Sequence, residues 1–157
     1  MENYLSVLED SLRRKVVVLD DIIALSVEQE KLLKQEKLDL EAFDELIDKK
    51  DELSEELTRL DDGFESLYGR IKNQLQNGKD AYRTQIAAMQ KLITEITEKT
   101  VSVQAKEERN KELLSNQLAE LRQDLNQNRR TSKAAYDYYK NMSNAGAMMS
   151  QFMDQKK

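Results

Sequence analysis

The chain of 157 residues contains no cysteine, no histidine and no proline, and it has only four glycines. Without cysteine it has no disulfide scaffold, no thiolate nucleophile and no cysteine metal site. Without histidine it lacks the commonest general base and the commonest metal ligand. Few residues are left for tight turns or for loops that hold phosphate groups. These absences disfavour most enzyme classes, and we expect neither catalytic residues nor a cofactor.

The charge of the chain is net acidic and unevenly placed, with 25 Lys and Arg against 30 Asp and Glu. Residues 39–76 hold 5 basic and 12 acidic side chains, whereas residues 126–157 hold 6 and 2. Net acidity argues against a nucleic-acid partner. The apolar run Val16–Leu19 is too short for a signal peptide or a membrane span. We therefore expect a cytoplasmic protein with no stable membrane insertion.

Apolar residues recur every three or four positions along most of the chain, which is the pattern of helices that bury one face. The pattern predicts a first helix over 3–36 and a second over 40–76. The core-facing seam of the second helix takes positions 43, 46, 50, 53, 57, 60, 64, 67, 71 and 74, and all but Lys50 and Gln74 of these ten are apolar. Asp39 is the expected N-cap of the second helix, because its carboxylate can accept from the free amides of the next turn. Asn77-Gly78 predicts the following turn, because both residues tolerate positive φ.

A third helix is predicted to start at about Asp80. Its apolar positions lapse between Val103 and Leu114, and this eleven-residue step predicts a phase shift of the stutter type. No glycine or proline occurs between 79 and 130, so we expect one continuous helix of about 50 residues, roughly 75 Å long.

Short connections make neighbouring helices antiparallel. The predicted fold is therefore all-α: a partly open antiparallel bundle of three long helices over residues 1–130, with the third helix longest and packed against the second. Residues 131–157 are rich in Tyr and Met and are expected to form a flexible tail, either disordered or a short helix.

In this arrangement the third helix extends past its two companions from about residue 118. Leu118, Leu121 and Leu125 then lie on one face with no helix beside them, although burying each is worth about 1.5–3 kcal/mol. We interpret this overhang and the tail as a protein-binding surface. The alternative is that these leucines are ordinary core, because the helix bends or the tail folds back. A further alternative is a structural coiled-coil protein that works as a homodimer or larger oligomer.

Several stretches resemble the FlgN family of flagellar export chaperones, and its clostridial members in particular. They are the opening MENYLSVLEDSLRRKVVVL, Gln29-x3-Leu33, the acidic DLEAFDELIDKKDELSEELTRLDDGFESLYGRIK of residues 39–72, YDYYKNM of 136–142 and the ending QFMDQKK. The helix-two stretch and the ending carry most of the weight.

The resemblance implies a small, cytoplasmic, all-helical protein that is not an enzyme. FlgN-like proteins bind hook–filament junction proteins, prevent their premature assembly and deliver them to the flagellar type III export gate. In the family the C-terminal part binds cargo, and a tyrosine there is associated with docking at the gate. Carried onto this sequence, the implied protein-binding residues are Leu114, Leu118, Leu121, Leu125, Tyr136, Tyr138 and Tyr139. A chaperone for another helical export client is the neighbouring alternative.

Overall fold

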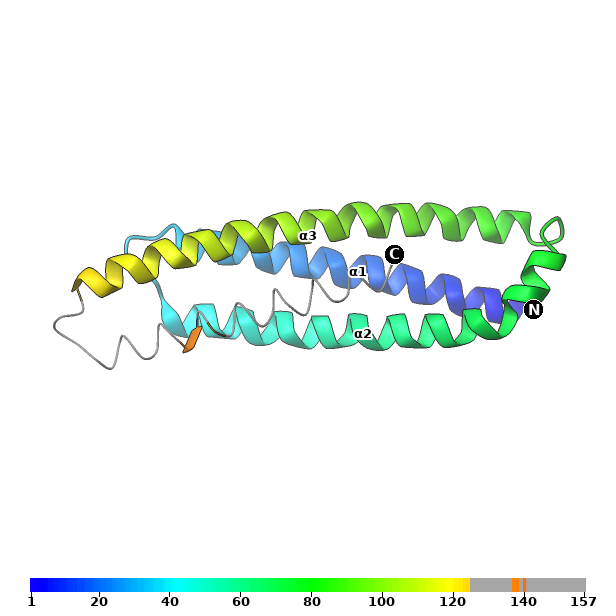
Figure 1. Cartoon of the computed structure of the whole chain (residues 1–157), viewed down its shortest axis with the longest axis horizontal. Coiled ribbons are helices and arrows are strands. Elements are labelled where there is room, and N and C mark those ends of the chain that lie inside the picture. The colour runs from blue at the N-terminus through cyan, green and yellow to red at the C-terminus, as the bar shows by residue number, and fades with distance from the viewer. Residues whose placement is uncertain (125–136, 139, 141–157) are drawn as a thin grey trace.

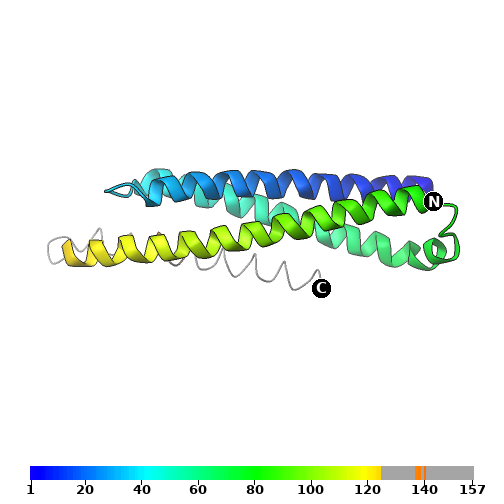
Figure 2. The ribbon, with the colours of Figure 1, turned by 90° about the horizontal axis from the view of Figure 1, so that it is seen from above.

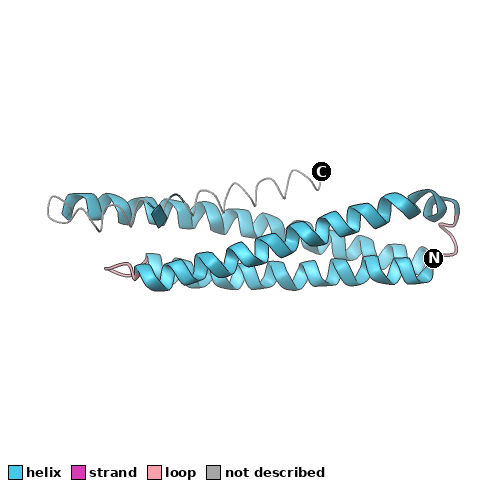
Figure 3. Cartoon of the chain, turned by 90° about the horizontal axis from the view of Figure 1, so that it is seen from below, coloured by secondary structure: helices cyan, strands magenta, loops and turns pink. Residues whose placement is uncertain are grey.

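The computed structural model describes residues 1–124 together with 137, 138 and 140. Three long helices make up this part of the chain: α1 (Glu2–Leu33), α2 (Leu40–Asn77) and α3 (Arg83–Asp124) (Figure 1). α3 has 42 residues, against 38 in α2 and 32 in α1. Figure 3 shows the two connecting loops at opposite ends of the elongated molecule. The predicted all-α fold with a longest third helix is confirmed.

The helix boundaries follow local side-chain chemistry. The Asp39 side chain accepts a hydrogen bond from the Ala42 N–H at 3.1 Å, which confirms the predicted N-cap of α2. α2 ends at Asn77 with Gly78 as its C-cap, which confirms the predicted turn, although the φ of Gly78, −111°, lies outside the left-handed region. Small size matters there instead, because a Cβ on Gly78 would lie 3.2 Å from the Tyr82 ring. α1 ends three residues before the predicted boundary, and α3 begins three residues after it.

α1 is the central helix of the three. It packs against both α2 and α3, running antiparallel to α2 and parallel to α3 (Figures 1 and 2). No Cα atom of Leu40–Asn77 lies within 8 Å of one in Arg83–Asp124. The expected packing of the second helix against the third is nevertheless confirmed through side chains, because Lys50 pairs with Glu107 and Phe43 shares a buried cluster with Leu114. Side chains rather than close backbones bridge α2 and α3, which makes the bundle partly open, as predicted.

The main apolar core fills the part of the bundle nearest the N-terminus and the α2–α3 loop. Its buried members come from all three helices: Leu5, Leu8, Leu12, Val18, Leu19, Ile22, Leu57, Ile71, Leu75, Met89, Leu92, Ile96 and Val103. Each buried side chain of this size contributes about 1.5–3 kcal/mol. We call this set the main core.

The buried face of α3 keeps one phase through the stretch where a stutter was predicted. Its buried positions are spaced by three or four residues: Thr100, Val103, Glu107, Asn110, Leu114 and Gln117. The step from Val103 to Leu114 is therefore made of regular steps of four, three and four, with polar residues at the two intermediate core positions. The predicted stutter was wrong, whereas the continuity of the helix is confirmed as far as Asp124.

Candidate protein-binding site

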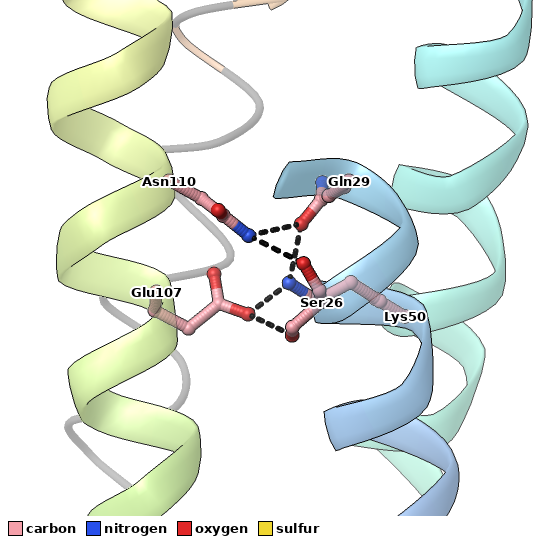
Figure 4. A network of polar contacts seen from close by, with 5 residues as sticks. All are labelled: Ser26, Gln29, Lys50, Glu107 and Asn110. Carbon is pink, nitrogen blue, oxygen red and sulfur yellow. Dashed lines mark hydrogen bonds and ion pairs between the residues drawn. The ribbon is translucent and has the colours of Figure 1, made fainter. Parts of the chain in front are cut away.

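A layer of buried polar side chains crosses the bundle next to the main core. Its members come from all three helices: Ser26 and Gln29 of α1, Lys50 of α2, and Glu107 and Asn110 of α3 (Figure 4). The Lys50 ammonium pairs with the Glu107 carboxylate and donates to Gln29 Oε1 at 2.8 Å. Asn110 Nδ2 donates to the Ser26 carbonyl oxygen at 2.9 Å, and Ser26 Oγ donates to Glu107 Oε1 at 3.3 Å. We call these five residues the polar layer.

The polar layer keeps a charged pair in a place where single charges are costly. Burial lowers the pKa of the Lys50 ammonium, and the Glu107 carboxylate offsets part of that effect. Removing one partner of such a pair costs about 3–5 kcal/mol, because the other charge stays buried. The network needs residues from three helices at one level, so it disfavours sliding of one helix along another.

A second, smaller apolar cluster lies on the other side of the polar layer, at the end that carries the α1–α2 loop. Its fully buried members are Leu33, Phe43, Ile47 and Leu114. Partly buried residues pack around it: Leu32, Leu38, Leu113, Leu118 and Tyr138. We call the four buried residues the distal cluster. It shares no residue with the main core, from which the polar layer separates it.

α3 continues past the end of α1 at this cluster. The Gln117 side-chain amide donates to the carbonyl oxygens of Leu33 at 2.9 Å and Gln35 at 2.8 Å, which satisfies acceptors that the helix end leaves free. Beyond Gln117, the last turns of α3 project past the α1–α2 loop (Figure 1), as the sequence predicted. Leu118 and Leu121 are half-buried on this part of the helix.

Tyr138 covers the α2 side of the distal cluster. Its ring meets the Phe43 ring edge to face, with centroids 6.0 Å apart and planes at 76°. Burial raises the pKa of the Tyr138 phenol, and the carboxylates of Asp44, Asp48 and Glu41 raise it further. The site thus has an apolar floor and an acidic rim on α2. Such a surface suits an amphipathic helix with basic flanks.

The structure brings together three of the seven predicted protein-binding residues. Leu114 is fully buried in the distal cluster, and Leu118 and Tyr138 pack against it from α3 and from the α2 side. Leu121 lies one turn further along α3. The remaining three lie outside the described residues: Leu125, Tyr136 and Tyr139.

Sequence reasoning missed Phe43 as part of this site, although Phe43 is the first apolar position of the predicted α2 seam. It also missed the pairing of Lys50 with Glu107. A signal was present in both cases, because Lys50 sits in the predicted seam and Glu107 falls in phase with Val103. Neither signal says which helix faces which.

The described part of the chain shows no arrangement for metal or membrane chemistry. In this part, no three of the Asp and Glu side chains are grouped so that they could hold a metal ion. None of α1, α2 and α3 combines the length and apolar character that crossing a bilayer requires.

Comparison with known proteins gives one family match. The model of the family described as FlgN protein matches residues 1–144. Searches of curated proteins and of solved structures give no match.

Proposed function

The chain belongs to the FlgN family, a family of flagellar export chaperones rather than enzymes, and on this premise we propose that it is a cytoplasmic chaperone for hook–filament junction proteins. It binds them through the end of α3 and the C-terminal tail, and it prevents their premature assembly. It then delivers them to the flagellar type III export gate. Leu125, Tyr136 and Tyr139 belong to this proposal as further contact residues.

The observation that carries the proposal is the incomplete cover of the distal cluster. Leu118 and Leu121 are only partly buried, and they follow Gln117, which already contacts the last residues of α1. A client helix laid along this part of α3 would bury their remaining apolar surface, at about 25 cal/mol per Å². The helix would also cover the end of the bundle where the core is smallest. Shielding a helical end of the client in this way is what prevents its assembly.

The acidic rim supports a client with basic residues beside its apolar face. Glu41, Asp44 and Asp48 lie on the first turns of α2, close enough to Tyr138 to raise the pKa of its phenol. Complementary charge of this kind speeds association and selects among partners more than it adds affinity. We therefore expect client association to slow as salt concentration rises.

The experiment is the double substitution Leu118→Asp with Leu121→Asp, tested by calorimetry against the purified hook–filament junction proteins of the same organism. We expect affinity to fall by at least about tenfold, because two carboxylates would be buried in an apolar contact. Both side chains are only half-buried in the free protein, so the thermal midpoint should move by only a few degrees.

A matched control exists on the same helix. Ile93 and Val101 are 45% and 54% exposed, and they lie on α3 beside the main core rather than the distal cluster. The pair Ile93→Asp with Val101→Asp adds the same charge and should leave client affinity unchanged. Equal losses from both pairs, or no loss from the first, would show that the end of α3 is not the client site.

A further inference from the structure

Tyr138 lies where a client side chain would have to enter the distal cluster. We propose that, in the chaperone without client, Tyr138 occupies this place on Phe43 and that an apolar side chain of the client helix displaces it on binding. The inference rests on the proposed function and adds a regulation to it: the client site is occupied by the protein's own ring until a client takes over.

The first support is the geometry of the contact. Phe43 is 0% exposed although it stands in the first turn of α2, at the end of the molecule. Tyr138 packs on this ring edge to face and is itself only half-buried. Part of the Tyr138 side chain therefore remains exposed to solvent. A side chain held in this way fills an apolar site without being locked into the core.

The second support is charge. The α2 stretch beneath Tyr138 belongs to the segment 39–76, which has a net charge of −7, whereas residues 126–157, which include Tyr138, have a net charge of +4. Opposite net charges favour contact between the C-terminal residues and the start of α2. The same acidic rim that would favour a basic client therefore also favours the chain's own C-terminal segment.

The third support is the expected strength of the contact. An edge-to-face aromatic contact favours the bound position of the ring by about two- to tenfold, in addition to the effect of burying its surface. A single half-buried ring therefore competes with a client measurably but does not exclude it. The apparent affinity for client is reduced by the fraction of molecules in which the site is occupied.

The experiment follows the ring contacts by nuclear Overhauser effects in the full-length protein, with labelled Phe and Tyr. In the free protein we expect cross-peaks between Phe43 and Tyr138. Saturation with the purified junction protein should remove them. The stacked pair Phe64 and Tyr68, with ring centroids 6.1 Å apart on α2, serves as an internal control and should keep its cross-peaks.

Affinity gives the second readout. Tyr138→Ala should tighten junction-protein binding by about two- to tenfold, whereas the control Tyr68→Ala should leave it unchanged. Weaker binding of the Tyr138→Ala protein, or cross-peaks between Phe43 and Tyr138 that survive client saturation, would overturn the exchange while leaving the client site intact. A wild-type protein that binds no junction protein would overturn the proposed function and the exchange together.

Discussion

The buried pair of Lys50 and Glu107 offers the sharpest test of the structure. Their side chains are 3% and 8% exposed, and Lys50 also donates to Gln29. Lys50→Met leaves a buried carboxylate without its cation, and Glu107→Leu leaves a buried ammonium without its anion. Each single change should lower the free energy of unfolding by about 3–5 kcal/mol.

The double variant should behave differently. Replacing both members of a buried ion pair by apolar side chains of similar size often leaves the stability of a protein unchanged or raises it. Here Gln29 and Ser26 would each lose a hydrogen bond, so we expect the double variant to lie within about 2 kcal/mol of the wild type. The two losses are then strongly non-additive, with a coupling free energy of at least about 3 kcal/mol.

Urea denaturation of the four proteins, followed by circular dichroism, measures this cycle directly. Lys15→Met is an informative comparison, because Lys15 is as deeply buried as Lys50 but pairs with Asp61, whose side chain is more exposed than that of Glu107. Single variants at Lys50 and Glu107 that each cost less than about 1 kcal/mol would refute the reasoning. Such values are typical of a pair that water reaches.

The pH dependence of the same cycle has a definite sign. Burial lowers the pKa of Lys50 below its ordinary value of 10.5 in the folded protein. Between the lowered pKa of Lys50 in the folded protein and its ordinary pKa of 10.5 in the unfolded chain, the unfolded chain binds more protons than the folded chain. The free energy of unfolding therefore rises with pH across that window. The wild type should therefore gain stability relative to Lys50→Met as the pH rises towards 10.5. If the stability of the wild type relative to Lys50→Met instead fell as the pH rose, the lowered pKa of Lys50 would be contradicted.

Three further predictions follow from single contacts. Leu114→Ala should cost about 2–5 kcal/mol in urea denaturation, because the side chain is fully buried; a cost below about 1 kcal/mol would show that the distal cluster is open in solution. Asp39→Ala should cost about 0.5–2 kcal/mol through loss of the N-cap, whereas Asp39→Asn should cost little. The contact of Tyr138 with Phe43 should weaken as the pH rises above 10.0, the ordinary pKa of tyrosine, because the raised pKa of Tyr138 means that the folded site prefers the neutral phenol. Phenolate absorbance of the wild type, compared with that of Tyr138→Phe, would detect this late titration. Identical titration curves of the two proteins would refute it.

Local chemistry is readable from the sequence. Asp39 is recognisable as the cap of α2, because an aspartate directly before an apolar periodic segment is typical of a helix start. The bounds of α2 are predicted closely, because eight of ten seam positions are apolar. Only five of those ten positions are fully buried, and the seam misses the buried residues Ile47, Ser54 and Leu75. The projecting end of α3 also follows from helix lengths and short connections alone.

The errors came from polar residues at buried positions. Glu107 and Asn110 look like an interruption of the α3 pattern, because a reading based on hydrophobicity counts a buried polar residue as exposed. Their burial depends on Lys50 and Ser26, which belong to other helices. A sequence does not show such partners until the helices are placed. The same limit applies to the central position of α1, which depends on packing choices among three similar apolar faces.

The candidate site is predictable in part for the same reason. Leu118 is predicted because it follows the end of the companion helices, and the structure places it at the distal cluster. Leu114, which only the family resemblance implies, is fully buried against Leu33 and Phe43. The contact between Tyr138 and Phe43 joins segments 95 residues apart, and no periodicity in the sequence encodes it.

Hydrogen exchange with mass spectrometry, with and without the junction protein, tests the central claim most directly. If clients bind at the distal cluster and the tail, added protection within residues 1–124 should be confined to 38–47 and 113–121, with further protection only at 125–139. Residues 57–75 and 89–103, which carry the α2 and α3 parts of the main core, should exchange as they do in the free chaperone. Protection concentrated at the α2–α3 loop, or spread evenly over all three helices, would contradict this account.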